Sequence, residues 1–412
     1  MVRMRAAHGV RTAPNRFTKN ERGIDVFHPY LLFPRIAPGM GSLALATALL
    51  AIAGPVHAAT LSVGPGKDYV APCAAFAAAK DGDTIDIVGD WTYSGDVCAI
   101  ARNNLTIRGV LGRPIIDAAG HNHGGKGTWL VTGNNITIEN VEMKNARVRD
   151  ANGAALRLEG TNFTLRRAFL HDNENGILSN ANPNSNIVIE HSEFGHNGHG
   201  DGQTHNLYIG SAKSLTFRYN YSHDAVIGHD LKSRAMVNMI AYNRFSSTPP
   251  GRAGSTASGK PSYEIDLPNA GTSYVIGNVI EQPAINDNST LLAYGEEGPT
   301  NPGQDLYVIN NTFLNDHTSG MFVWVSGKVS TPAVIENNVF GGPGTLTSQA
   351  SALQKDNQRL KKPDFIDRAG LTLRPLVNEM VAKAGPAADP WASGADTKEP
   401  ARRSSAKPGN AH

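Results

Sequence analysis

Charged side chains are scarce in this sequence, and neither sign dominates. Asp, Glu, Lys and Arg make up 18% of the 412 residues, beside 43 Gly and 24 Pro. Long surface helices depend on Glu and Lys, so the composition predicts short strands joined by many turns. Residues 1–58 hold seven basic and two acidic residues, which leaves 31 basic (38 less 7) and 34 acidic residues (36 less 2) in the rest. This weakly negative balance gives no electrostatic case for binding nucleic acid.

A long hydrophobic run is also missing. The apolar stretch "LALATALLAIAG" (43–54) is shorter than the roughly 20 residues that a membrane-spanning helix needs. It follows a basic segment and precedes Val56-His57-Ala58, which fits the small-residue rule for signal-peptide cleavage. We therefore predict a leader over residues 1–58, a secreted or periplasmic protein, and no stable membrane span after cleavage. An uncleaved membrane anchor is the alternative.

Only two cysteines are present, Cys73 and Cys98. Export places them in an oxidising compartment, where a disulfide persists. We predict that they pair near the start of the folded domain. Two buried free thiols are the alternative, because a sequence does not give the distance between the two residues.

A short strand motif recurs through the middle of the chain. Alternating β-branched or aromatic residues are followed by a polar pair that often contains Asn, as in "LTFRYNYS" (215–222) and "YVINNTF" (307–313). A constant strand motif at a variable period predicts the stacked coils of a solenoid. We expect a buried ladder of the aligned asparagines, which are spaced by 23, 35, 33 and 27 residues: Asn220, Asn243, Asn278, Asn311 and Asn338.

The segment "YVAPCAAFAAAKDGDTIDIVGD" (69–90) resembles the beginning of right-handed parallel β-helix proteins of the pectate-lyase-like superfamily. There, a short capping helix precedes a "GDTI" strand. The resemblance covers residues 60–345 and implies an all-β fold: a single right-handed parallel β-helix, with an N-terminal capping helix, over residues 59–385. The stretch 371–385 is similar to the segment that closes such helices. Residues 386–412 have the composition of a disordered tail. Because this fold hosts lyases, hydrolases, epimerases and adhesins, the fold alone assigns no chemistry.

A second series of strands carries most of the charge, beginning with "GHDLKSRA" (228–235). Strand alternation puts Leu231 and Ser233 inside and their neighbours outside. Stacking three such strands predicts one outward row of Asn206, Asp230 and Glu264 and a parallel row of Tyr208, Lys232 and Asp266, flanked by Arg234. At the strand starts, His205, His229 and Tyr263 share the inward parity, where they pack at the edge or turn toward a cleft. Such an ionic cluster is either a solvated face or a site.

The resemblance implies a lyase that cleaves an acidic, uronate-containing polysaccharide by β-elimination. Lys232 is then the candidate base, with Arg234, His229 and Asp266 as further catalytic residues. A positive Arg234 would lower the pKa of Lys232 and stabilise an enolate, while Asp230 and Asp266 would raise that pKa. Asp230 and Glu264, with Asn206, make a possible calcium site. The predicted substrate-binding residues are His205, Asn206, Tyr208, Tyr263 and Tyr294, although an insertion leaves the register of Tyr294 open.

Other functions remain open at this point. Asp230, Glu264 and Asp266 would also suit a glycoside hydrolase, although the chain lacks the "NTD" strand of similar polygalacturonases. A C5-epimerase shares the proton abstraction, and a non-catalytic polysaccharide-binding or assembly protein needs only the polar surface. The histidines of "HSEFGHNGHGDGQTH" (191–205) match no standard zinc spacing. We expect an acidic polysaccharide as the partner and a monomeric protein.

Overall fold

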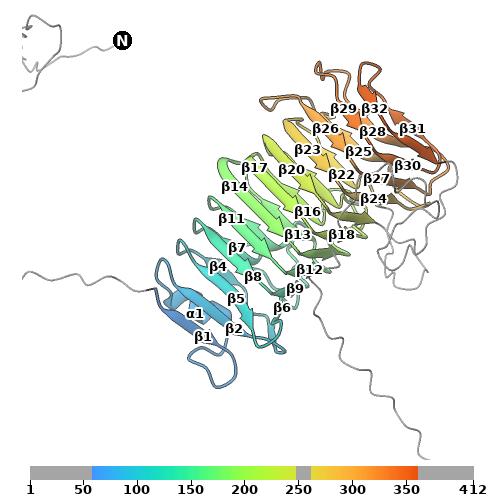
Figure 1. The fold of residues 1–412 in the computed structure, drawn as a ribbon. Coiled ribbons are helices and arrows are strands. Elements are labelled where there is room, and N and C mark those ends of the chain that lie inside the picture. The colour runs from blue at the N-terminus through green and yellow to red at the C-terminus, as the bar shows by residue number, and fades with distance from the viewer. Residues whose placement is uncertain (1–57, 247–260, 361–412) are drawn as a thin grey trace, which may run out of the picture. The chain divides into compact units, whose positions relative to one another are not determined.

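The computed structural model describes residues 58–246 and 261–360 of the chain. The predicted leader, the loop 247–260, the closing segment 371–385 and the tail 386–412 lie outside the described residues. Within the described part, parallel strands of three sheets succeed one another along the chain, so that each coil adds one strand to each sheet (Figure 1). The structure confirms the prediction of a single right-handed parallel β-helix.

In each coil the chain passes through the first, the second and then the third sheet. Among the described residues the first sheet has 12 strands. They are β1 (Thr60–Val63), β2 (Thr84–Val88), β5 (Thr106–Val110), β8 (Ile136–Glu139), β11 (Phe163–Arg166), β14 (Asn182–Glu190), β17 (Ala212–Arg218), β20 (Val237–Ala241), β23 (Thr272–Ile276), β26 (Leu306–Ile309), β29 (Val334–Glu336) and β32 (Leu353–Lys355).

The second sheet has 11 strands and the third sheet has 10 in the same described ranges. The second comprises β3 (Thr92–Ser94), β6 (Ile115–Asp117), β9 (Glu142–Lys144), β12 (Phe169–His171), β15 (Glu193–Gly195), β18 (Tyr221–His223), β21 (Arg244–Ser246), β24 (Val279–Gln282), β27 (Thr312–Asn315), β30 (Val339–Gly341) and β33 (Gln358–Leu360). The third comprises β4 (Cys98–Ile100), β7 (Gly127–Val131), β10 (Ala154–Leu158), β13 (Asn175–Ser179), β16 (Leu207–Ile209), β19 (Leu231–Ser233), β22 (Ile265–Leu267), β25 (Thr290–Tyr294), β28 (Met321–Val325) and β31 (Thr345–Thr347).

The core is a column of apolar side chains that the parallel register stacks from coil to coil. On the first sheet Ile189 aligns with Phe217, Phe217 with Ile240, and Ile240 with Val275. All four side chains are fully buried. In each strand, alternate side chains point toward the core, and they are covered by the side chains of the coils on either side. A single coil therefore cannot bury its own inner face. The stacking of coils therefore supplies the hydrophobic stabilisation of the fold.

The predicted asparagine ladder is present at the turn from the first to the second sheet. The side-chain Oδ1 of Asn243 accepts a hydrogen bond from the backbone N–H of Asn220 at 2.9 Å, and Asn278 does the same for Asn243. The residue before each ladder asparagine has a positive φ, 58° at Tyr219 and 57° at Tyr242. This tight turn keeps the first two sheets in constant register. Variation in coil length therefore falls mainly in the other connections, including the loop before the third sheet.

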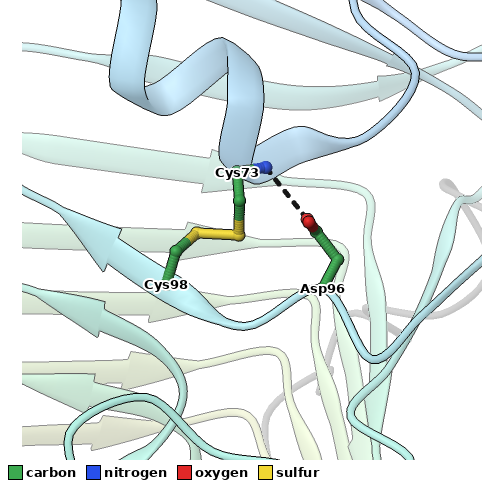
Figure 2. The surroundings of a disulfide bond; sticks show 3 residues. All are labelled: Cys73, Asp96 and Cys98. Atoms are coloured by element: carbon green, nitrogen blue, oxygen red, sulfur yellow. Dashed lines mark hydrogen bonds between the residues drawn. A yellow bond between two sulfur atoms is a disulfide. The ribbon is translucent and has the colours of Figure 1, made fainter.

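A short helix, α1 (Pro72–Ala78), contacts β1, β2 and β4. The predicted disulfide joins Cys73 to Cys98 with the Cα atoms 5.8 Å apart, and the carboxylate of Asp96 accepts a hydrogen bond from the Cys73 backbone N–H at 2.9 Å (Figure 2). The ring of Phe76 packs edge-to-face on Trp129 at 5.1 Å. A helix is thus fastened near the first coils, while its capping role stays a prediction. Among the described residues, no helix is both long and apolar enough to cross a membrane.

Candidate functional site on the third sheet

The structure confirms one of the two predicted rows on the third sheet. Tyr208 of β16 aligns with Lys232 of β19, and Lys232 aligns with Asp266 of β22. Between them, the fully buried Leu231 and Ser233 point inward. Neighbouring strands are about 4.8 Å apart, so these three polar side chains lie side by side on the outer face of the sheet.

The other predicted row does not point outward. Asn206, Asp230 and Glu264 have exposed fractions of 0%, 1% and 0%. Each is the residue immediately before its strand begins, where the chain is still turning in from the second sheet. Strand alternation therefore does not apply to these positions. The amide Nδ2 of Asn206 donates hydrogen bonds to Asp230 Oδ1 at 2.9 Å and to the backbone oxygen of His223 at 2.8 Å.

Asp230 and Glu264 form a buried carboxyl pair where the chain enters the third sheet. Burial raises the pKa of both groups, and their mutual repulsion raises that of Glu264 further. Burial and the repulsion between two carboxylates favour a proton on one of them, and we place that proton on Glu264. Asn206 turns its N–H₂ rather than its oxygen to Asp230, whereas Asp230 Oδ2 and both Glu264 oxygens are buried without a hydrogen-bond partner among the described residues. The calcium site therefore stays a prediction.

The outward side chains converge on one carboxylate that the sequence did not place, Glu297. Lys232 Nζ lies 2.9 Å from Glu297 Oε1 and 3.0 Å from Asp266 Oδ2. Arg234 Nη2 lies 2.7 Å from Glu297 Oε2, and Arg234 Nε donates a hydrogen bond to the phenolic oxygen of Tyr208 at 2.7 Å. We call Lys232 and Arg234 the cationic fork. Both come from a single stretch of chain, and both contact the same carboxylate.

The electrostatics of Lys232 differ from one sequence expectation. Burial alone would lower the pKa of the ammonium group, but the carboxylates of Asp266 and Glu297 outweigh burial and raise that pKa. Arg234 is not among the causes of this shift, and the opposing effect predicted for Asp266 prevails. Burial raises the pKa of Asp266 to about 7, against the effect of Lys232. Lys232 is consequently a protonated cation in this arrangement.

Three aromatic rings line the strand starts beside the fork. The rings of His205 and His229 stack with centroids 4.5 Å apart, and Tyr263 lies 5.0 Å beyond His229. Burial, followed by the charge of Lys232, lowers the pKa of His205 to about 3. Burial and the two neighbours His205 and Lys232 hold the pKa of His229 well below its usual range. Both imidazoles are therefore neutral, with His229 Nε2 3.5 Å from Asp266 Oδ2.

Tyr294, predicted to bind substrate, lies in the core instead. It aligns with the inward-facing Leu267 of the preceding coil and is fully buried. Its hydroxyl donates a hydrogen bond to the backbone oxygen of Gly271 at 2.7 Å. The register explains this position, because a residue paired with an inward neighbour also faces inward. Two glutamates follow in "GEEG" (295–298), and Glu296 accepts a hydrogen bond from Tyr263 at 2.7 Å.

A second polar cluster, the histidine cluster of His171, His196 and His223, lies on or next to the second sheet. His171 Nδ1 is 2.6 Å from Asp172, and its Nε2 is 3.3 Å from Glu142. Two coils later, His223 is held in the same way by Asp224 at 2.8 Å and Glu193 at 3.2 Å. Although burial opposes it, the flanking carboxylates raise the pKa of both rings to about 9.

One group in the histidine cluster has the spacing of a metal site. Ligand atoms of His196, His223 and Asp224 lie within 4.8 Å of one another. Both ring nitrogens of His223 already bond to carboxylates and carry protons. A cation would have to replace those protons, so we assign no metal to this group.

Comparison with known proteins places the fold. No family model and no curated protein matches the sequence. Among solved structures, pectate lyase Pel9A matches with a TM-score of 0.50 and 14% identity over 73% of this chain and 79% of that one. This chain shares the parallel β-helix fold of that structure. An alginate lyase from Paenibacillus sp. str. FPU-7 (TM-score 0.39, 14% identity, 74% and 97% covered) and a pectin methylesterase from Yersinia enterocolitica (0.36, 14%, 76% and 96%) also match. At 14% identity these matches show the fold of this chain and do not assign its activity.

Proposed function

We propose that this chain is a polysaccharide lyase that cleaves a uronate-containing polymer by β-elimination on the outer face of the third sheet. The observation that carries the proposal is the cationic fork. Lys232 and Arg234 together bind the two oxygens of one carboxylate, Lys232 at Oε1 (2.9 Å) and Arg234 at Oε2 (2.7 Å). A site that already holds a side-chain carboxylate in this way suits the carboxylate of a uronic acid.

The chemistry requires such a fork. The proton on the carbon beside a sugar carboxylate is weakly acidic, because its removal puts negative charge on the carboxylate oxygens. Two fixed cations stabilise that charge as it develops. A base takes the proton, a double bond forms within the sugar ring, the glycosidic C–O bond breaks, and the leaving oxygen takes up a proton. The products are a reducing end and an unsaturated uronide.

Roles for the side chains follow from their charges. A protonated Lys232 neutralises the sugar carboxylate together with Arg234, and the fully buried Asp266 holds the ammonium group in place. For the proton acceptor we select Tyr208, which is half-buried rather than buried. Its oxygen accepts a hydrogen bond from Arg234 Nε at 2.7 Å, so it lies beside the fork that would hold the sugar carboxylate. This assignment replaces Lys232 as the base, because that lysine would first have to lose a strongly held proton.

A hydrolase is less well supported. Hydrolysis needs two carboxyl groups on opposite sides of the scissile bond, about 5 to 9.5 Å apart. Of the three predicted acids, Asp230 and Glu264 are buried and paired with each other, and Asp266 is buried against Lys232. None of them is free to approach a glycosidic oxygen.

The decisive experiment incubates the full chain with a panel of acidic polysaccharides and follows the absorbance of unsaturated uronides. We expect an increase that is lost in Lys232→Met and in Tyr208→Phe, by at least about 100-fold. Lys232→Arg should retain measurable activity if the lysine supplies charge, whereas a base role would abolish it. Lys213→Met, at an exposed lysine of β17, is the matched control and should match the wild type. New reducing ends without the absorbance would contradict elimination, as would binding with neither signal.

A further inference from the structure

The cationic fork is already occupied by a carboxylate from the chain itself. We infer that Glu297 is a built-in stand-in for the sugar carboxylate, which must leave the fork before an acidic sugar binds there. This inference rests on the proposed function of the fork. It names the substrate class as polymers with free carboxylates and assigns Glu297 a role in specificity.

Glu297 fills the position with both of its oxygens. Oε1 lies 2.9 Å from Lys232 Nζ, and Oε2 lies 2.7 Å from Arg234 Nη2. Arg234 also donates a second hydrogen bond, from Nη2 to Oε1 at 2.8 Å. A uronate carboxylate has the same two oxygens and the same charge, and it would make the same contacts. The two carboxylates therefore compete for one position.

The two acids around Lys232 differ in their freedom to move. The Asp266 side chain is fully buried, whereas the Glu297 side chain is 41% exposed. Glu297 lies on a turn between Gly295 and Gly298, which have φ angles of 76° and 110°, and the space beside Gly298 is open to at least 4 Å. Rotation of the Glu297 side chain would move its carboxylate into water without disturbing β19 or β22. Asp266 would stay behind as the fixed counter-charge of Lys232.

This arrangement makes displacement selective. When Glu297 leaves, the fork loses a counter-charge from a half-buried position. An incoming carboxylate restores it, but a neutral sugar or a methyl-esterified uronate does not. Leaving a partly buried cation without its partner is costly, so neutral ligands cannot hold the fork open. Glu297 thus rejects neutral sugars and lowers the affinity for acidic ones, because the intramolecular carboxylate is always present.

The test measures binding by calorimetry with two acidic probes, trigalacturonate and trimannuronate, and with the methyl ester of each. We expect Glu297→Gln to bind at least one acidic probe about 10-fold more tightly than the wild type, which corresponds to about 1.4 kcal/mol. The esters should not bind the wild type detectably, and Glu297→Gln should bind them more tightly than the wild type does, because no carboxylate then has to be displaced. Glu336→Gln is the matched control, at a glutamate paired with Lys355 on the surface, and its affinities should equal those of the wild type.

Equal or weaker binding of both acidic probes to Glu297→Gln would overturn the inference and make Glu297 a positioning residue for the fork. Should the glutamine variant unfold, Glu297→Asp serves in its place, since a shorter carboxylate cannot reach both cations and should also raise affinity. The two proposals fail separately. If Glu297→Gln binds acidic probes more tightly but no unsaturated product forms, the role of Glu297 is supported and the lyase activity is contradicted. If the wild type catalyses elimination but Glu297→Gln binds no more tightly, the lyase activity is supported and the role of Glu297 is contradicted.

Discussion

Histidines occur in both polar clusters of this protein, and two from each cluster are in opposite charge states. The third member of the histidine cluster, His196, has its pKa lowered by burial. Beside the third sheet, His205 and His229 are neutral, because burial and the nearby Lys232 lower their pKa values. On the second sheet, the flanking carboxylates raise the pKa values of His171 and His223 to about 9. Residue type alone therefore does not determine what these rings do.

The partners of each ring explain the difference. In His171 and His223, each ring nitrogen contacts a carboxylate. One carboxylate belongs to the next residue and the other to an earlier coil. Such a ring has no nitrogen left for chemistry and serves as a fixed cation. In the third-sheet group, His229 Nδ1 is buried without a hydrogen-bond partner among the described residues, and its Nε2 lies 3.5 Å from a single carboxylate, Asp266. The first arrangement satisfies both ring nitrogens, whereas the second leaves one ring nitrogen of His229 without a partner among the described residues.

The largest expected effect is on the rate of elimination, which should depend on the third-sheet histidines and not on those of the second sheet. His229→Asn should lower the rate of uronide formation about 100-fold, because the ring lies against Asp266, which in turn holds Lys232. His171→Gln should leave the rate within about twofold, since its ring contacts no residue of the fork. Rates would be measured on the polymer that gives elimination, after thermal unfolding shows that both variants fold. Equal losses in the two variants would remove the functional distinction.

A smaller effect concerns stability and pH. The pKa of His171 rises from 6.5 to about 9 on folding, so its stabilisation is fully present below pH 6.5 and is lost as the pH rises through about 9. With Asp172 half exposed, we expect His171→Gln to lower the free energy of unfolding by on the order of 1–2 kcal/mol near pH 6. The difference from the wild type should vanish above pH 9.

The depressed pKa of His229 has the opposite sign. A neutral buried ring takes up a proton on unfolding, so the wild type should lose stability as the pH falls below 6.5. His229→Asn should therefore show a shallower acid loss than the wild type. The free energies of unfolding of His171→Gln and His229→Asn can both be measured by urea unfolding at a series of pH values. Curves that stay parallel to the wild type across this range would contradict the assigned charge states.

The sequence predicted the positions that local periodicity controls. Alternation around Leu231 placed Lys232 on the outer face, and the stacking of three such strands aligned it with Tyr208 and Asp266. The same rule failed for Asp230, which lies one residue before its strand and turns into the corner. Glu297 was missed because the connection after β25 has its own length, and no periodicity relates it to a residue 65 positions earlier. The charge of Lys232 was then misjudged, since this distant partner helps to raise its pKa.

The smallest effect tests how the second-sheet histidines acquire their charge. Glu142→Gln removes one of the two carboxylates at His171, the more distant one at 3.3 Å, and leaves Asp172 at 2.6 Å. The pKa of His171 should fall from about 9 but remain above 6.5, as measured by NMR titration of the ring. The cost in unfolding free energy should be about 0.5 kcal/mol, typical of a partly exposed ion pair. An unchanged pKa would assign the whole shift to Asp172. A fall below 6.5 would show instead that burial dominates once a single carboxylate is lost, so that two carboxylates are needed to keep a second-sheet histidine charged.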